Sequence, residues 1–285
     1  MLRSVFLIVS FLLFFKTSGQ TKEVIFDSKV QPNREYVTKT TSYGKMEIHF
    51  QGPEELFKAM KENGNKNPMI FESSNSIVET RRTFDLEADS TFQATILYGY
   101  VENVEIINGE RNETESPFSK LYAEGFYNSE NLLKIDSLVS NVSDVETRRV
   151  LIYSLENSED GIKFPDYPLT IGDSFKSSFV KFINVPTKRN LKVIVEITFT
   201  LEKVVGSEAF YKFEQVLLPN EINELRNVFI TGLGSGYTVY DISRKYVVRH
   251  NNDLNVDLKM EEAGAQVNLK MVSNYKSLVT IRGMQ

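Results

Sequence analysis

The segment LKVIVEITFTLEKVV, residues 191–205, indicates the fold more clearly than any other part of the chain. Every second residue from Leu191 to Leu201 is apolar, and most of the residues between them are charged or carry a hydroxyl group. This period of two indicates a long strand with one buried face. The following stretch, residues 206–218, opens with Gly206 and Ser207 and then alternates again, so the pair predicts a β-hairpin.

Other parts of the chain are also rich in strand formers, namely residues 35–50, 91–107 and 265–281. Long strands joined by short polar turns favour an antiparallel sheet. We therefore predict a mainly β, α+β protein: a curved antiparallel sheet or open half-barrel(s), with two short packed helices.

The two helices are expected at residues 52–65 and 143–161. The first segment has Pro53 near its start and Gly64 near its end, and the second begins with Ser143 or Asp144 as a cap. An amphipathic helix normally turns its apolar stripe towards a core, so both should pack on the sheet. The expected stripes are Leu56, Phe57 and Met60 in the first helix, and Val145, Ile152 and Leu155 in the second.

The N-terminus has the layout of an export signal. Arg3 precedes an apolar run at residues 5–15, and Thr17 and Gly19 are small residues before a cut at Gln20. The run is too short to cross a bilayer core. We predict a cleaved signal peptide at residues 1–19 and a bacterial protein that is periplasmic or secreted, with no transmembrane segment after signal removal. The chain has no cysteine, so stability must come from packing and not from disulfides.

The mature part, residues 20–285, is expected to form one β-rich domain. Residues 30–36 and 169–175 share an apolar start, a turn and an aromatic end. This echo leaves open two pseudo-repeated halves, about 20–142 and 164–285, joined by a helix at about 144–157. The net charge of −5 and the scattered basic doublets argue against a nucleic-acid partner.

The most motif-like stretch is TGLGSGYTVYD, residues 231–241. A dinucleotide-binding loop needs the spacing G-x-G-x-x-G followed by a helix. Here Gly232, Gly234 and Gly236 give G-x-G-x-G, and strand formers follow. We therefore expect a β-bulge, or the close approach of a neighbouring strand, and no phosphate site.

Other candidate chemistry is weak. Residues 253–262 have a calcium-loop-like start, but they lack the required glycine and glutamate and alternate like a strand. His49 and His250 are the only histidines, and their surroundings predict separate surface positions without zinc. No G-x-S-x-G motif occurs. We therefore assign no catalytic, cofactor-binding or metal-binding residue, and expect no cofactor. A pair of catalytic carboxylates is neither supported nor excluded.

Three stretches carry a resemblance: FPDYPLTIGDSF (164–175), VIVEITFTLEKV (193–204) and GLGSGYTVYDISRKYVV (232–248). Together they resemble an uncharacterised family of exported β-rich proteins of Bacteroidetes-type bacteria. The resemblance implies a turn at Gly172 and Asp173 before an aromatic strand, and it implies no activity. The expected architecture is also similar to the curved sheet with tucked helices of periplasmic lipoprotein carriers.

The functional expectation is a non-enzymatic envelope protein that binds a lipid or another apolar ligand in a curved sheet. The 20 Phe and 13 Tyr residues are suited to a core, or to the lining of an apolar cavity. A structural or protein-interaction module of the envelope is the alternative, and a hydrolase of envelope material is a third hypothesis. The sequence sets neither the ligand nor the oligomeric state.

Overall fold

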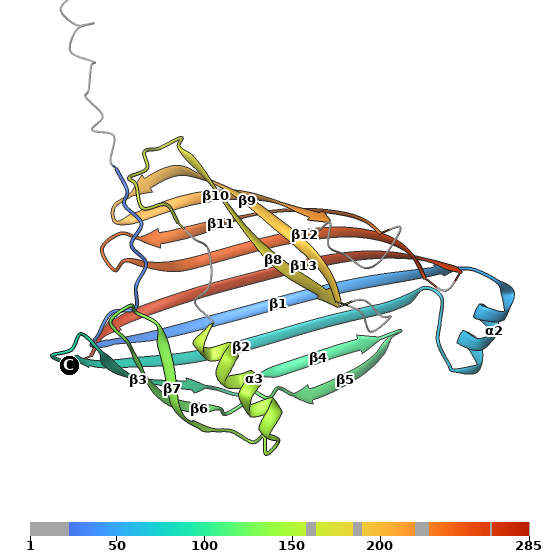
Figure 1. Ribbon diagram of the computed structural model, residues 1–285, viewed down its shortest axis with the longest axis horizontal. Coiled ribbons are helices and arrows are strands. Elements are labelled where there is room, and N and C mark those ends of the chain that lie inside the picture. The colour runs from blue at the N-terminus through green and yellow to red at the C-terminus, as the bar shows by residue number, and fades with distance from the viewer. Residues whose placement is uncertain (1–22, 158–163, 185–189, 220–227, 263, 285) are drawn as a thin grey trace, which may run out of the picture.

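The computed structural model describes residues 23–157, 164–184, 190–219, 228–262 and 264–284 (Figure 1). The expected signal peptide and its cleavage site at Gly19 and Gln20 lie outside the described residues. The strands are β1 (Arg34–Gln51), β2 (Met69–Leu86), β3 (Phe92–Tyr98), β4 (Glu102–Ile107), β5 (Glu110–Glu115), β6 (Tyr122–Tyr127), β7 (Leu133–Val139), β8 (Ser174–Asn184), β9 (Asn190–Val205), β10 (Glu208–Pro219), β11 (Phe229–Asp241), β12 (Tyr246–Glu262) and β13 (Ala265–Gly283). The helices are α2 (Glu54–Glu62) and α3 (Val145–Glu156).

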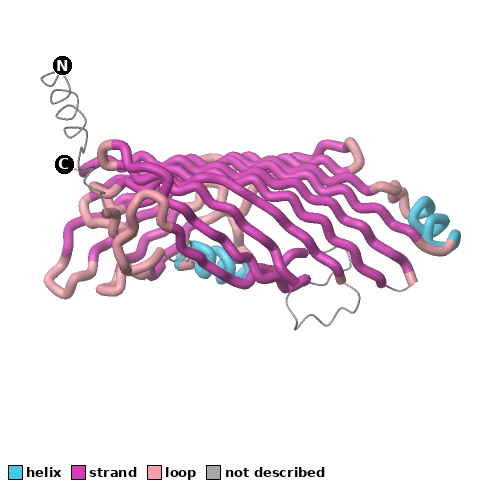
Figure 2. The backbone as a smooth tube through the Cα atoms, turned by 90° about the horizontal axis from the view of Figure 1, so that it is seen from above, coloured by secondary structure: helices cyan, strands magenta, loops and turns pink. Residues whose placement is uncertain are grey.

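All described strands join one antiparallel sheet that curves without closing (Figures 1 and 2). The strand order is β7-β6-β3-β2-β1-β13-β12-β11-β10-β9-β8, and β4 and β5 extend the sheet from another part of β2. The predicted mainly β fold with two helices is confirmed. Because β1 pairs with β13, strands from the two ends of the described chain meet in the middle of the sheet. The duplication of the two halves stays a prediction.

The alternation of side chains gives the sheet two different faces. In β9 and β10 the odd-numbered residues from Val193 to Leu201 and from Ala209 to Leu217 are buried, whereas the even-numbered residues are partly or fully exposed. We call the face with the buried side chains the inner face and the opposite one the outer face. The predicted hairpin is formed by these two strands, and Gly206 in its turn has a φ of 59°.

Two clusters of buried side chains lie on the inner face. The first, here called the hairpin core, is centred on Phe199, Tyr211 and Phe213, and Phe26 from the N-terminal segment packs against it. The second, here called the α3 core, is built from strands β3, β6 and β7 and is covered by Leu151 and Leu155 of α3. The two clusters occupy different parts of one sheet, so the space between them is left to shorter or less buried side chains.

The helices differ from the expectation in detail. The carboxylate of Asp144 caps α3 by accepting a hydrogen bond from the backbone N–H of Thr147 at 2.7 Å. Leu155 is buried as expected, but Val145 is 62% exposed and Leu151 takes its place, so the predicted stripe is partly wrong. Helix α3 packs against β7. In this position Leu151 and Leu155 face the α3 core, and Val145 does not.

Helix α2 has no buried residue, and its half-buried residues are those of the expected stripe, Leu56, Phe57 and Met60. The pairing of β1 with β2 ends at Ile48 and Met69. The connection between these strands therefore runs beyond the edge of the sheet, where no inner face lies beneath it. Figures 1 and 2 show α2 projecting from that end of the molecule.

The turn before β8 is held by Gly172 and Asp173. Gly172 has a φ of 99°, which suits glycine, and the Asp173 carboxylate accepts hydrogen bonds from the N–H and hydroxyl groups of Thr170. These hydrogen bonds hold the pKa of Asp173 below its usual value. The two turn residues thus lie in a tight, locally capped turn.

Candidate functional site

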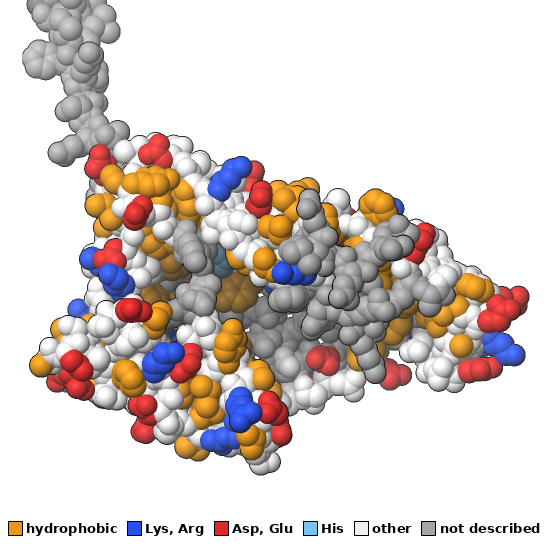
Figure 3. All heavy atoms as spheres, viewed as in Figure 1, with side chains coloured by type: hydrophobic (Ala, Val, Ile, Leu, Met, Phe, Trp, Pro, Cys, Tyr) orange, Lys and Arg blue, Asp and Glu red, His pale blue; other side chains and the backbone are white. Residues whose placement is uncertain are grey.

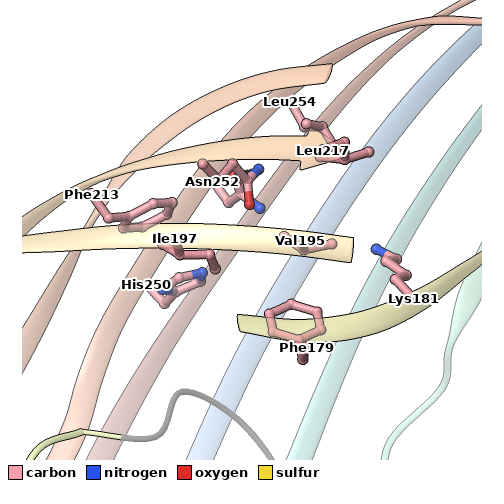
Figure 4. Close-up of a pocket in the computed structure, with 10 residues that line it drawn as sticks. Phe179, Lys181, Val195, Ile197, Phe213, Leu217, His250, Asn252 and Leu254 are labelled. Atoms are coloured by element: carbon pink, nitrogen blue, oxygen red, sulfur yellow. Dashed lines mark hydrogen bonds between the residues drawn. The ribbon is translucent and has the colours of Figure 1, made fainter. Parts of the chain in front are cut away.

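Described residues of the inner face line two adjoining hollows. The smaller one has a volume of about 190 Å³ and lies under the β9–β10 hairpin (Figure 4). The larger one, of about 540 Å³, lies over the middle of β1, β2 and β13. Lys181 and Leu254 line both hollows, which together are called the trough. Figure 3 shows hydrophobic side chains at the floor of a depression in the middle of this face.

Most of the surface that lines the trough is apolar, and half of the lining residues have apolar side chains. The smaller hollow is lined by Phe179, Val195, Ile197, Phe213, Leu217 and Leu254, and the larger one by Met46, Phe71, Ile107, Leu254 and Met271. Polar residues line both hollows; in the larger one they are Lys45, Glu72, Ser73, Glu105, Lys181 and Ser273. In the smaller hollow they are Lys181, Gln215, His250 and Asn252. This composition is typical of ligand pockets in proteins, which are mostly apolar with a few placed polar groups.

The curvature of the sheet is what assembles the trough. Six strands separate β8 from β2 in the strand order, yet Lys181 of β8 and Phe71 of β2 line the same hollow. Glu105 of β4, which lies beyond β2, lines it as well. A flat sheet of these strands would hold the same side chains far apart. The site therefore forms because the sheet is curved, and no single hairpin contains all of its residues.

Short side chains keep the larger hollow unfilled. Gly44 on β1 lies opposite Ser73 on β2 and opposite Ser273 on β13, and all three line the hollow. A Cβ added to Gly44 would meet only the Ser73 hydroxyl, at 3.2 Å. At Gly44, Ser73 and Ser273 the floor of the hollow is therefore mostly backbone. Larger side chains cover the same three strands on either side, in the hairpin core and in the α3 core.

The glycines of β11 have a different role. Their register with β12 is continuous, and the irregularity lies between Val239 and Tyr240, so no bulge occurs at Gly232, Gly234 or Gly236. Close approach explains all three, and a Cβ on Gly232 would lie 2.8 Å from the Cβ atom of Leu217. A Cβ on Gly236 would lie 1.9 Å from the Asn251 carbonyl oxygen, and one on Gly234 would lie 2.7 Å from the carbonyl oxygen of Asp253. The glycines therefore let neighbouring strands and side chains cover β11 closely.

His250 lines the trough and is half-buried, so the expectation of a surface position is wrong for this histidine. Its ring stacks on Phe213 with centroids 5.2 Å apart, and Nδ1 lies 2.9 Å from the Thr238 hydroxyl. Burial lowers the pKa of His250 to about 4. The ring is thus neutral near pH 7 and contributes an aromatic wall. His49 lies on the outer face, with Nε2 2.5 Å from the Glu47 carboxylate.

A second polar pair lies beside His250. The side-chain amide of Gln215 donates a hydrogen bond to the side-chain oxygen of Asn252 at 2.8 Å. Gln215 is buried, and its neighbour on the inner face of β9 is Ile197. The two amides satisfy each other while leaving further polar groups on both side chains, and they form the polar end of the smaller hollow.

Charged groups line the trough at separate points. The side chains of Lys45 and Glu72, which border the larger hollow with their backbone, lie on the outer face and pair there at 2.8 Å. Within the described part of the chain, neither Lys181 nor Glu105 forms an ion pair or a side-chain hydrogen bond. Lys181 is the charged side chain that lines the smaller hollow. The trough therefore offers one unpaired cation near its centre and one unpaired anion on the β4 side.

A buried polar cluster also occurs in the α3 core, but it is closed. Arg81 pairs with the Glu79 carboxylate at 3.0 Å and donates a hydrogen bond to the hydroxyl group of Tyr127. Tyr98 donates a hydrogen bond to the other oxygen of Glu79 at 2.6 Å. Burial raises the pKa of Tyr127 to about 12, so the phenol stays protonated. Because Glu79 bonds to both Arg81 and Tyr98, and Arg81 also bonds to Tyr127, we interpret this cluster as structural.

Two classes of feature do not occur in the described residues. Within those ranges, no group of three or more His, Cys, Asp or Glu side chains is arranged to hold a metal ion. In the same part of the chain, neither helix has the length and apolar character that a membrane span requires.

The key residues of the trough are not among those singled out from the sequence. Lys181, Phe179 and Phe175 share one parity in SFKSSFVKFIN, so period two alone places Lys181 on the inner face of β8. That signal was available in the sequence. What no single strand could reveal is that Phe71 and Glu105 lie across the hollow from Lys181, since this depends on the curl of the whole sheet.

Comparison with known proteins gives only distant structural similarity. No protein-family model and no curated protein sequence matches the chain. A structure that describes lipid–protein interactions in lipovitellin has a TM-score of 0.45 and 10% identity over 90% of this chain. The match spans only 26% of the lipovitellin chain. An outer membrane channel of Pseudomonas putida F1 has a TM-score of 0.24 and 7% identity over 89% of this chain and 98% of its own. OccK5 of Pseudomonas aeruginosa has a TM-score of 0.23 and 6% identity, covering 89% of this chain and 100% of its own. These values assign neither a family nor a function.

Proposed function

We propose that the protein is an exported, non-enzymatic envelope protein that binds an apolar or amphiphilic molecule in the trough. The observation that carries the proposal is the trough itself, an apolar depression that the fold leaves unfilled between two well-packed cores. The larger hollow alone, at about 540 Å³, has the size of a small-molecule site.

The energetics favour an apolar occupant. The exposed floor of the larger hollow includes Met46, Phe71 and Met271, which are only partly buried in the free protein. Each methylene group that a ligand buries there contributes about 0.8 kcal/mol before the cost of association. Methionine side chains adapt to ligands of different shapes, which suits a site for flexible chains. An alkyl chain is therefore the natural partner for this surface.

The hydrolase hypothesis is less well supported by the trough. The contact that most resembles a nucleophile and its base is Thr238 with His250. Thr238 has no exposed surface, so its hydroxyl group cannot reach a substrate. That group instead fixes the orientation of a neutral ring. A catalytic pair must contact the substrate, and this pair does not.

A protein-interaction module is the second candidate, and one observation favours it. Strand β8 is the last strand on its side of the described sheet, and Val180 on its outer face is 47% exposed. A free edge of this kind can pair with a strand of another protein. A partner bound there would protect the backbone amides of β8 from hydrogen exchange and would leave the trough open.

The test is a titration of the mature chain with N-phenyl-1-naphthylamine, an uncharged apolar fluorophore. We expect a saturable rise in fluorescence for the wild type. Ser273→Arg places a long charged side chain in the larger hollow and should abolish it. Val272→Arg is the matched control, because Val272 is the preceding residue on the outer face and is 48% exposed.

Circular dichroism must show that both variants are folded. The absence of saturable binding by the wild type would contradict the proposal. So would equal binding by Ser273→Arg and Val272→Arg, because the fluorophore would then sit outside the trough.

A further inference from the structure

We infer that the trough selects an amphiphile with one alkyl chain and an anionic carboxylate head, and that Lys181 binds the head. This inference rests on the proposed function and names the ligand class of the same site. Its first support is position. Lys181 and Leu254 are shared by both hollows, so an ion held by the lysine can extend an alkyl chain into either of them.

The second support is the charge of the surroundings. Lys181 has no ion-pair partner within the described residues, whereas the side chain of Lys45 lies on the outer face and pairs with Glu72. The remaining polar side chains of the smaller hollow are the uncharged His250, Gln215 and Asn252. An unpaired ammonium group beside an apolar surface is complementary to a carboxylate attached to an alkyl chain.

The third support is the neighbourhood of the lysine on its own strand. On the inner face of β8, Phe179 lies two residues before Lys181. Val193 of β9 lies directly opposite Lys181. Figure 4 shows Lys181 with Val195, Leu217 and Leu254 at one end of the smaller hollow, and Phe213 and His250 at the other. A lysine stem can lie along such a surface while its ammonium group meets water or an anion.

Two features of the molecule compete with this interpretation. Lysine on an edge strand can simply prevent the addition of a foreign strand, and in that role it needs no ligand. Glu105 also lines the larger hollow, and it would attract a cationic head group instead. The experiment must separate an anion site at Lys181 from both alternatives.

The experiment is calorimetric titration of the mature chain with dodecanoate, dodecanol and dodecyltrimethylammonium, which share one alkyl chain and differ in head-group charge. We expect dodecanoate to bind most tightly, and its affinity to fall as salt is added, because Lys181 is exposed to solvent. Lys181→Gln should weaken dodecanoate roughly fivefold and leave dodecanol unchanged. Glu105→Gln should not weaken dodecanoate.

The control variant is Lys176→Gln. Lys176 lies on the same edge strand but points to the outer face, opposite Thr198. If β8 lysines only protect the edge, both substitutions raise aggregation and neither changes the affinity for dodecanoate, which overturns the inference. Tighter binding of dodecyltrimethylammonium, or equal dodecanoate affinity in wild type and Lys181→Gln, also overturns it. Binding of dodecanol with no preference for dodecanoate refutes only the role of Lys181, whereas no binding of any probe refutes the proposed function as well.

Discussion

The trough and the α3 core lie on one inner face, and the same long strands, β1, β2 and β13, run through both. At the α3 core, Tyr36 of β1 lies between Arg81 of β2 and Ile281 of β13, and large side chains fill the space. At the trough, Gly44 lies between Ser73 and Ser273 in the same three strands. The backbone pairing is alike in both places. Side-chain volume therefore decides which part of the face is filled.

This difference separates stability from binding within one sheet. The α3 core has a helix over it, buried aromatic rings and a closed polar cluster, so it contributes to the free energy of folding. The larger hollow of the trough is lined by the half-buried Met46, Phe71 and Met271 and exposes apolar surface to whatever enters it. Substitutions in the α3 core should therefore change stability most, and substitutions at the trough should change binding and solvent access.

The largest loss of stability is expected from Arg81→Met in the α3 core. The substitution leaves the buried carboxylate of Glu79 without its cation, and breaking a buried pair in this way costs about 3–5 kcal/mol. Urea unfolding of the mature chain measures the change. Arg82→Met is the control, since Arg82 lies on the outer face and pairs with Glu35 in solvent, and it should cost less than ~1 kcal/mol. Equal losses would contradict the burial difference between the two faces.

The next effect is a pH dependence that originates in the trough. Because the pKa of His250 is lowered to about 4 in the folded state, the unfolded chain takes up a proton first as the pH falls. The neutral ring therefore contributes its full share to the free energy of unfolding above the unfolded pKa of about 6.5. As the pH falls towards 4, the free energy of unfolding decreases by about 2–3 kcal/mol.

The measurement is the unfolding free energy of wild type and His250→Phe at a series of pH values. Subtracting the two curves removes the contribution of the carboxylates that titrate in the same range. We expect the wild type to lose the contribution of His250 as the pH falls and the His250→Phe variant not to lose it. Parallel curves for wild type and His250→Phe would show that the ring is not desolvated.

A smaller loss is expected where β11 is covered by its neighbours. Gly236→Ala forces a Cβ against the Asn251 carbonyl group and the Phe213 ring, and such overpacking costs about 1–3 kcal/mol. Gly44→Ala in the trough meets only a hydroxyl group and should cost less than ~1 kcal/mol. Thermal or urea unfolding of both variants provides the comparison. A larger cost at Gly44 would mean that the hollow is too tightly packed to admit a ligand.

The smallest change in stability accompanies a probe of solvent access. The chain has no cysteine, so single cysteines report on their own positions. Ser273→Cys in the trough should change stability by about 0.5 kcal/mol or less and react with a maleimide in the folded protein. Ala123→Cys, buried in the α3 core, should react only when the core opens. Rates measured by mass spectrometry should differ strongly, and similar rates would remove the contrast between the two regions.

The strands could be predicted from local patterns, because each carries its own alternation. The hairpin of β9 and β10 is the clearest case, since Val193 to Leu201 already mark one buried face. The turn at Gly172 and Asp173 could also be located, because glycine and a capping carboxylate act within a few residues of each other.

The trough could not be predicted, because it depends on contacts between distant strands. The curl brings Lys181 to the same hollow as Phe71, and nothing within either strand encodes that contact. The wrong prediction for His250 has the same cause. Its position in a polar stretch beside Asn251 and Asn252 indicates exposure, whereas β10 places Phe213 against its ring.

The most direct test of the open trough is a crystal structure of the mature chain soaked with ω-bromododecanoate, using the anomalous signal of bromine to locate the alkyl end. We predict the carboxylate near the Lys181 ammonium group and the bromine among the apolar side chains of the trough, such as Phe71 and Met271. We also predict no bromine signal in the α3 core. Bromine located in the α3 core or on the outer face, or a trough occupied by the protein's own side chains, would contradict the claim that this part of the inner face is left open for a ligand.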